Sequence, residues 1–252
     1  MTIFFEERPS ESPYIENVTY GGTAFDGVVI RPSEIHWHMV LSRFEGKARF
    51  TVVGPWTSAG ELTYTGGADI LWIKLRLGTF LPWLPGRKIL NSEIALPEAT
   101  SRSVWLNGSA WQFPDYENVE TFVNHLYRTG ALALDPVVHA ALNDQQPDVA
   151  PRTLRHRFLQ STGLTQNHIQ QYRRAQRAAA MLQQGTPILD TVFEAGYFDQ
   201  PHMTKSLRQF IGYTPAQILR GGSSDGSIAE ASPDDADSGL CTSVESAIAG
   251  AL

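Results

Sequence analysis

Apolar residues recur at every second position in several short runs of the first half of the chain. Two such runs lie at residues 35–41 and 71–77, and Gly and Pro residues separate the runs along the chain. A Glu-Gly pair at residues 45–46 is suited to a hairpin turn. Period-two alternation between such breaks is typical of antiparallel strands that bury one face. We therefore expect residues 10–112 to form a β domain, a small antiparallel barrel or sandwich.

From residue 115 onward the apolar period changes to that of a helix. Phe122 and Leu126 are four positions apart in this stretch, Asp115 is suited to be the N-cap, and Gly130 follows the last apolar residue. The pattern predicts a helix at 116–129, inside a linker at 113–132 that connects two domains and contributes to dimerisation.

The rest of the chain, up to residue 220, is predicted to be helical. Pro residues suited to the first turn of a helix and Gly residues suited to its end punctuate this part. Gly196 separates two of the expected helices in the manner of a helix-turn-helix, because the sharp turn requires a positive φ that Gly adopts without steric cost. The expected helices are at 136–142, 151–162, 165–184, 187–195, 199–211 and a short one from 215.

Charge is distributed unevenly along the chain. The net charge is −4 for residues 1–138, +4 for residues 139–220 and −6 for residues 221–252. A basic segment inside an acidic protein is where an anionic partner is expected to bind. Residues 221–252 have no aromatic side chain and are rich in Gly, Ser, Ala and Asp, so we expect a disordered acidic tail.

The composition excludes several classes of protein. Apolar residues make up 42% of the chain, which is enough for a folded core, and no stretch approaches the ~20 apolar residues of a membrane span. Cys241 is the only cysteine, which excludes an intrachain disulfide and a zinc site of several thiolates. The first residues are acidic, unlike a secretory signal, so the cytoplasm is the expected compartment.

Residues 195–215 resemble the C-terminal signature of the AraC family of bacterial transcription regulators. Residues 152–158, Gly163 and residues 174–178 are similar to the first recognition helix and the connecting helix of that family, so the resemblance covers roughly residues 149–219. Residues 72–80 are similar to a segment of the cupin-like sensor domains that precede such helices. The resemblance implies an α+β multidomain protein, with an N-terminal antiparallel, cupin-like β-barrel followed by an all-α helix-turn-helix DNA-binding domain at 133–220.

The resemblance also implies a function and a set of contact residues. Two helix-turn-helix units, held by the helix at 165–184, would each place a recognition helix in the major groove of double-stranded DNA, ~34 Å apart. The front domain would bind a small-molecule effector or mediate homodimerisation, and neither catalysis, a cofactor nor a membrane partner is expected. The residues expected to contact DNA are Arg152, Arg155, His156, Gln200, Pro201, His202, Thr204 and Lys205. Arg157, Arg173, Arg174 and Arg208 are expected on phosphates or on the solvated surface.

This chain differs from the family pattern in two respects. The segment before the first recognition helix is about ten residues too short for the usual scaffold helix of a helix-turn-helix, which predicts a lone first recognition helix. Pro201 occupies a position usually held by a small polar residue, and Lys205 one usually held by Arg. Pro is tolerated in the first turn of a helix, and Lys keeps the charge of Arg without its bidentate fork.

Two other functions remain open at the level of sequence. His36 and His38 have the spacing with which cupins hold a metal, so a cupin-type metal-dependent enzyme with a helical appendage is one alternative; a polar strand face or pocket wall is the other interpretation of the pair. Because the first unit is short, a regulator that acts through protein contacts is the second alternative. The six Trp residues are candidates for the walls of an effector pocket, and some of them are expected in the core.

Overall fold

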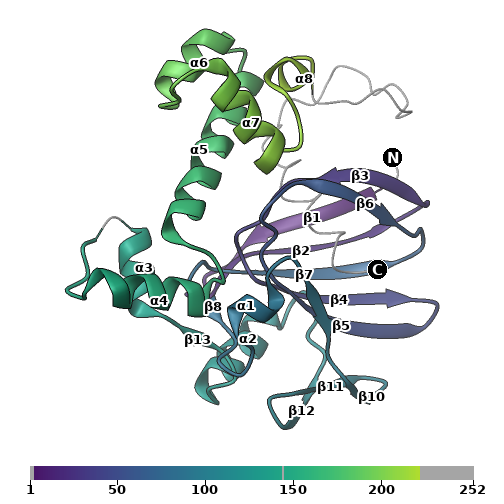
Figure 1. The fold of residues 1–252 in the computed structure, drawn as a ribbon. Coiled ribbons are helices and arrows are strands. Elements are labelled where there is room, and N and C mark those ends of the chain that lie inside the picture. Colours follow the sequence, from purple (N-terminus) through teal and green to yellow (C-terminus); the bar gives the residue numbers. More distant parts are fainter. Residues whose placement is uncertain (1–2, 144, 222–252) are drawn as a thin grey trace.

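The computed structural model describes residues 3–143 and 145–221 (Figure 1). Antiparallel strands occupy the first part of the chain, and helices occupy most of the second part. Helix α5 extends away from the sheet and carries helices α6–α8 at its far end, whereas α3 and α4 lie at its near end (Figure 1). The predicted α+β layout, with a β domain before a helical domain, is confirmed.

Six strands form the main sheet in the order β1-β2-β7-β4-β5-β9, and all neighbours in it are antiparallel. The pair β3–β6 forms a separate sheet, as do β10–β11–β12 and β13–β8. Over the described residues, no ladder joins the two edge strands β1 and β9, so the main sheet is not closed into a barrel. The strands are β1 (Ile3–Pro9), β2 (Ile15–Thr23), β3 (Gly27–Arg31), β4 (His38–Phe44), β5 (Lys47–Val53), β6 (Gly60–Tyr64), β7 (Asp69–Leu75), β8 (Thr79–Phe80), β9 (Glu93–Ala95), β10 (Glu98–Thr100), β11 (Ser103–Leu106), β12 (Ser109–Gln112) and β13 (Ala133–Leu134).

The helices of the described chain follow the predicted pattern closely. Thr165 accepts a hydrogen bond from the His168 N–H and Asp199 accepts one from the His202 N–H, which are the N-cap contacts that satisfy otherwise unpaired helical donors. Gly196 has a φ of 72°, as its place in the helix-turn-helix turn predicts. The helices are α1 (Gly86–Ile89), α2 (Val119–Arg128), α3 (Pro136–Leu142), α4 (Pro151–Ser161), α5 (Gln166–Gln183), α6 (Ile188–Glu194), α7 (Gln200–Phe210) and α8 (Pro215–Leu219).

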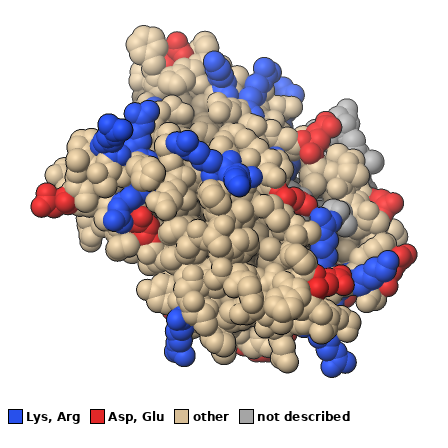
Figure 2. Space-filling model, turned by 60° about the horizontal axis from the view of Figure 1, so that its bottom comes forward, with Lys and Arg blue, Asp and Glu red and all other residues tan. Residues whose placement is uncertain are grey.

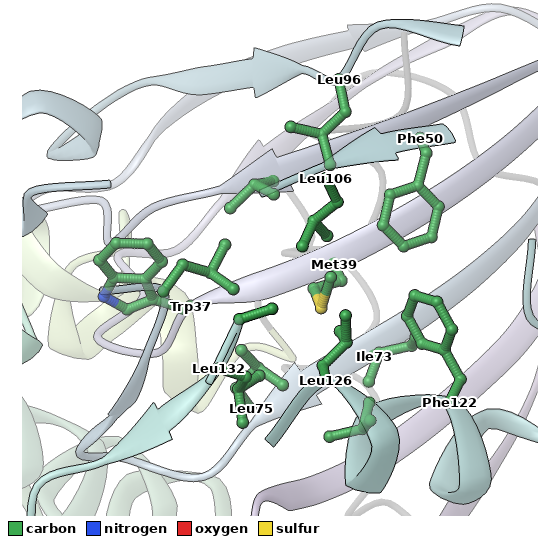
Figure 3. Close-up of a cluster of buried hydrophobic side chains, with 14 of the residues drawn as sticks. Trp37, Met39, Phe50, Ile73, Leu75, Leu96, Leu106, Phe122, Leu126 and Leu132 are labelled. Atoms are coloured by element: carbon green, nitrogen blue, oxygen red, sulfur yellow. The ribbon is translucent and has the colours of Figure 1, made fainter. Parts of the chain in front are cut away.

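The main sheet buries apolar side chains on both of its faces. Met39, Val52 and Ile73 are cross-strand partners on one face and belong to the largest hydrophobic cluster (Figure 3). On the other face Val40 pairs with Trp72, and both pack with the half-buried Trp56. The strict alternation of residues 35–41 and 71–77 therefore places neighbouring residues on opposite faces, both of which are covered.

Helix α2 is part of the β domain rather than a separate linker. Its apolar side places Phe122 and Leu126 in the same cluster as Met39 and Phe50, where their side chains point toward the sheet (Figure 3). The prediction that Asp115 is the N-cap is wrong: the N-cap is Asn118 and the helix begins at Val119. Asp115 instead accepts hydrogen bonds from two backbone N–H groups of the preceding turn. Because the apolar face of α2 is occupied by its own sheet, it is not free to bind a second copy of the chain.

Two further hydrophobic clusters organise the helical half. In the first, Ala175, Ala179 and Leu182 of α5 pack against α6, α7 and α8. In the second, Phe158 of α4 and Ile169 of α5 pack with Val138, and also with two residues of the β domain, Ile35 and Leu77. The β domain and the base of the helical half therefore share one core.

The predicted acidic tail and Cys241 lie outside the described residues, apart from Gly221. Among the helices that the structure describes, none combines the length and the apolar character needed to cross a membrane.

The packing of α2 predicts a large stability effect at a position that the sequence pattern assigns to a linker. Leu126→Ala is expected to lower the free energy of unfolding by ~2–5 kcal/mol, because it removes a fully buried side chain from a packed core. The exposed Thr121→Ala on the same helix is the control and is expected to change it by no more than ~0.5 kcal/mol. Urea denaturation measures both. Equal stabilities of the two variants would mean that α2 is a detachable linker.

Candidate nucleic-acid interface

Helix α7 is held to the rest of the helical half by one side only. Met203, Leu207 and Phe210 are buried in the cluster shared with α5, at the spacing of an amphipathic helix. Tyr197 lies just before the helix, and its hydroxyl is hydrogen-bonded to Ser206 Oγ at 2.9 Å. These contacts fix which side of α7 faces solvent.

The predicted contact residues of α7 lie on that solvent side. Gln200, Pro201, His202 and Lys205 are exposed, and Thr204 is half-buried. An open hollow of about 490 Å³ on this side is lined by Gln200, Pro201, Thr204, Lys205 and Arg208. The structure therefore brings the predicted residues of this helix together on one surface.

The N-terminal end of α7 explains how Pro201 is tolerated. Asp199 is the N-cap and binds the His202 N–H at 2.8 Å, so the chain needs no N–H at position 201. The His202 ring packs edge-on against Tyr197, with ring centroids 5.3 Å apart, and the Arg174 guanidinium lies 5.7 Å from the Tyr197 ring. His202 is thus held at the exposed start of the helix, which is the part of a recognition helix that reaches base edges.

Helix α4 has the same division into a buried and an exposed side. Phe158 is buried, whereas Arg152, Arg155 and His156 are exposed. All three predicted contact residues of this helix therefore face solvent together, on the two turns that precede Phe158.

The prediction that α4 is a lone recognition helix is corrected by its packing. The seven-residue helix α3 lies against α4, and its Val138 enters the same cluster as Phe158. Asp135 caps α3 and also pairs with Arg157 of α4 at 3.1 Å. A shorter helix therefore supports α4, and one nitrogen of the partly exposed Arg157 guanidinium is paired with the cap of that helix.

A residue that the sequence analysis overlooked lies beside these contacts. Phe198 is 90% exposed and immediately precedes the N-cap of α7. Exposed apolar side chains also occur on α6, where Leu189 is 62% and Phe193 is 76% exposed. An aromatic residue directly before a polar N-cap, outside the apolar stripe of either helix, is the sequence signal that could have identified Phe198.

Positive charge accompanies the exposed sides of the helices. On the face shown in Figure 2, Lys and Arg side chains are more frequent than Asp and Glu over the helical half, at the left and top of the view. Over residues 139–220 the net charge is +4, whereas residues 1–138 are acidic. This distribution favours a polyanion as the partner of the helical half.

The His36–His38 pair of the β domain belongs to a buried ionic centre around Glu34. One Glu34 oxygen lies 2.5 Å from His36 Nδ1, and the other lies 3.2 Å from Lys74 Nζ and 3.7 Å from His38 Nε2. Burial alone would raise the pKa of Glu34, but the attraction of Lys74 and His36 outweighs it and keeps that pKa well below its usual range. The carboxylate is therefore ionised and already paired.

This arrangement does not fit a metal site. The ammonium group of Lys74 occupies the position beside the carboxylate that a cation would need, and no group of three metal-ligating side chains is found among the described residues. Burial also lowers the pKa of His38 to about 3; the charge of Glu34 opposes this, and Lys74 and His36 each lower the pKa by less. The observations that motivated a cupin-type metal enzyme are thus explained by a charge pair inside the protein.

Comparison with known proteins identifies only the helical half. A family model described as a helix-turn-helix domain matches residues 147–221, which include both α4 and α7. No curated protein and no solved structure matches the chain. The cupin-like character of the β domain stays a prediction.

The ionic centre predicts that acid destabilises the protein. The pKa of His38 is lower in the folded than in the unfolded chain, so the folded state binds fewer protons and stability falls as the pH drops below ~6.5. The depressed pKa of Glu34 acts in the same direction below ~4.5. Between pH 7 and pH 5, the wild type is expected to lose about 2 kcal/mol more unfolding free energy than His38→Gln.

Urea denaturation at pH 7, 6 and 5 measures this difference. His156→Gln, which replaces an exposed histidine, is the control and is expected to follow the wild type. Parallel pH profiles for His38→Gln and the wild type would show that His38 is not buried in its neutral form.

Proposed function

We propose that the chain is a DNA-binding transcription regulator of the AraC type and that it reads double-stranded DNA with both α4 and α7. The match of residues 147–221 to a helix-turn-helix domain supports this proposal. The observation that carries this proposal is the shared geometry of the two helices. Each buries one side in a core that includes α5 and exposes polar and basic side chains on the other. Neither exposed side is covered by another described segment of the chain.

The length of α5 supports simultaneous binding. Its 18 residues span about 27 Å, at the usual rise of 1.5 Å per residue. Successive major-groove segments on one side of B-DNA are ~34 Å apart. A connecting helix of this length, with one recognition helix packed near each end, therefore suits two adjacent turns of the duplex.

The exposed residues suggest a division of roles. Arg152 and Arg155 are suited to guanine O6 and N7, and Gln200 to adenine. Phe198 is suited to apolar contact with a thymine methyl group. Lys205 and Arg208 are suited to phosphates, where a charge is needed but a fixed fork is not. His156, Pro201, His202 and Thr204 complete the proposed contact surface.

The mechanism we propose is equilibrium binding, without bond chemistry. Basic side chains displace counterions from the phosphates and supply affinity, and contacts to base edges supply sequence preference. Control by a small effector would require the ligand to favour one arrangement of the domains, with a coupling of typically ~1–3 kcal/mol.

Buried polar atoms support the β domain as the place where an effector would bind. Thr51 Oγ1, Trp56 Nε1 and His38 Nδ1 are buried without a hydrogen-bond partner in the described part of the chain. His38 and Thr51 lie on the same face of the sheet as Val40, which packs with Trp56. A polar ligand with matching donors and acceptors would satisfy such atoms, whose burial is otherwise costly.

A second candidate function, action through protein contacts, is favoured by α6. Leu189 and Phe193 lie four residues apart and are both largely exposed, and the exposed Asp190 and Glu194 follow them. This surface is apolar and acidic, so it is unsuited to DNA. It is compatible with DNA binding by α7, because a regulator can contact a protein and its operator together.

Alanine substitutions test the assignment of DNA contacts. An operator is first selected from a randomised pool of duplexes. Arg155→Ala and His202→Ala are each expected to weaken binding to it by ~1–3 kcal/mol, because each removes a proposed base contact. Fluorescence anisotropy measures the affinities, and circular dichroism checks that the fold is retained.

The matched control is Arg102→Ala, which removes an exposed arginine from the β domain and is expected to leave the affinity unchanged. Lys205→Ala is expected to reduce the slope of log K against log salt by about 0.9, the value for one phosphate contact. Unaltered operator affinity in both Arg155→Ala and His202→Ala would refute the assignment.

A further inference from the structure

The β domain contacts the second recognition helix directly at its C-terminal end. The Ser33 N–H donates to the carbonyl of Phe210 at 2.8 Å, and the Ala59 N–H donates to the carbonyl of Gln209 at 2.7 Å. The last carbonyls of a helix have no partner inside the helix, so two backbone groups of the β domain complete the hydrogen bonding of α7. Figure 1 shows this end of α7 directed toward β3.

Side-chain packing closes the same junction. Gly212, which follows α7, leaves no room for a side chain, because a Cβ atom there would lie 2.4 Å from Ile30 Cγ2 and 3.3 Å from Ala59 Cβ. Ile30 of β3 and Ala59 therefore lie against the end of the recognition helix. Arg31, the next residue, is buried and stacks over Trp56 at 4.1 Å, which orders the segment that supplies Ser33.

The first recognition helix is also fixed to the β domain at its C-terminal end. Gly163, after α4, and Gly86, in α1, meet backbone to backbone, since a Cβ on Gly163 would lie 2.8 Å from the Gly86 carbonyl oxygen. A contact this close leaves α4 little freedom to tilt on the β domain. Both recognition helices thus contact the β domain, α4 through α1 and α7 through the segments next to β3 and β6.

The segment that carries the ionic centre of Glu34 also contacts the helical half, because Ile35 belongs to the cluster of Phe158 and Ile169. Tyr172, on α5, is half-buried and packs against the cluster that contains Ile35 and Leu77 of the β domain. Burial and the negative charge of Glu34 both raise its pKa. The Tyr172 hydroxyl accepts a hydrogen bond from Gln176 of the same helix. The helix that connects the two recognition helices therefore packs beside the segment that carries Glu34, whose charge Lys74 and His36 neutralise.

We propose that the β domain fixes the distance and relative orientation of the two recognition helices, and so determines the spacing between half-sites that the protein accepts. Its three anchor points are Gly86 for α4, the Glu34 centre for α5, and the Ser33–Ala59 pair for α7. This inference rests on the proposed binding of DNA by both helices. It assigns Ile30 and Glu34 as positioning residues, which act on DNA only through α5 and α7.

The test compares spacing preference in full-length variants. Ile30→Asp places a charge against the end of α7, and Glu34→Gln removes the charge that holds Lys74 and His36. Val28→Asp is the matched control, because Val28 lies on the same side of β3 two residues away and is 62% exposed. Each protein is titrated with the selected operator and with duplexes that have 2 bp added or removed between the half-sites.

The wild type and Val28→Asp are expected to bind the selected spacing ~10-fold more tightly than the altered ones, because 2 bp rotates one half-site by about 70°. For Ile30→Asp and Glu34→Gln this preference is expected to fall to ~3-fold or less, while circular dichroism shows an intact fold. An unchanged spacing preference in both variants overturns the inference.

A measurement without DNA separates this inference from the proposed function. Spin labels are placed on Lys47→Cys in the β domain and on Leu189→Cys in α6, in a Cys241→Ser background, and their distance distribution is measured. A narrow distribution in the parent that broadens with Ile30→Asp and with Glu34→Gln supports the anchor points. A broad distribution in the parent, or a narrow one in both variants, overturns them. If no operator can be selected, the proposed function fails, and the label distances still decide whether the β domain holds the helices.

Discussion

The structure depends on one helix that must bury different stripes along its length. Helix α5 places Ile169 and Tyr172 against α4 and the β domain near its start, and Ala175, Ala178 and Leu182 against α6–α8 toward its end. Small alanine side chains let the neighbouring helices approach closely, and the larger residues fill the wider space at the base. Both recognition helices therefore pack on α5, which connects them, while the β domain contacts the C-terminal end of each.

The second constraint is a charge that is buried where the two halves meet. Removing a carboxylate from water is costly, and the cost is offset only when cations and hydrogen-bond donors surround it. Lys74 and His36 provide this environment for Glu34, and Tyr172 of the helical half packs against the cluster that contains the next residue, Ile35. A charged group at this place requires well-defined geometry from both halves, which an apolar contact would not. The same pairing explains why two histidines with cupin-like spacing do not form a metal site here.

Much of the local structure follows from the sequence. The boundaries of α5 and α7, their caps Thr165 and Asp199, and the positive φ of Gly196 follow from residue types whose preferences act over a few positions. The same holds for the exposure of Arg155 and Gln200, because amphipathic spacing determines which side of a helix is buried. The seven-residue α3 was also predicted, but not its role as the support of α4.

Tertiary structure decided the features that depend on partners distant in sequence. The sequence does not show that α2 covers the sheet, that Arg157 pairs with Asp135, or that Ser33 and Ala59 complete the hydrogen bonding of α7. Each of these contacts joins segments separated by more than twenty residues. In the last case the groups are a backbone N–H, which every residue except proline carries, and a backbone C=O, which every residue carries. The sequence by itself thus determined the helices, the caps Thr165 and Asp199, and the outward side chains of α4 and α7. Only the packed chain determined where those two helices are held, because a backbone hydrogen bond between distant segments leaves no residue signature.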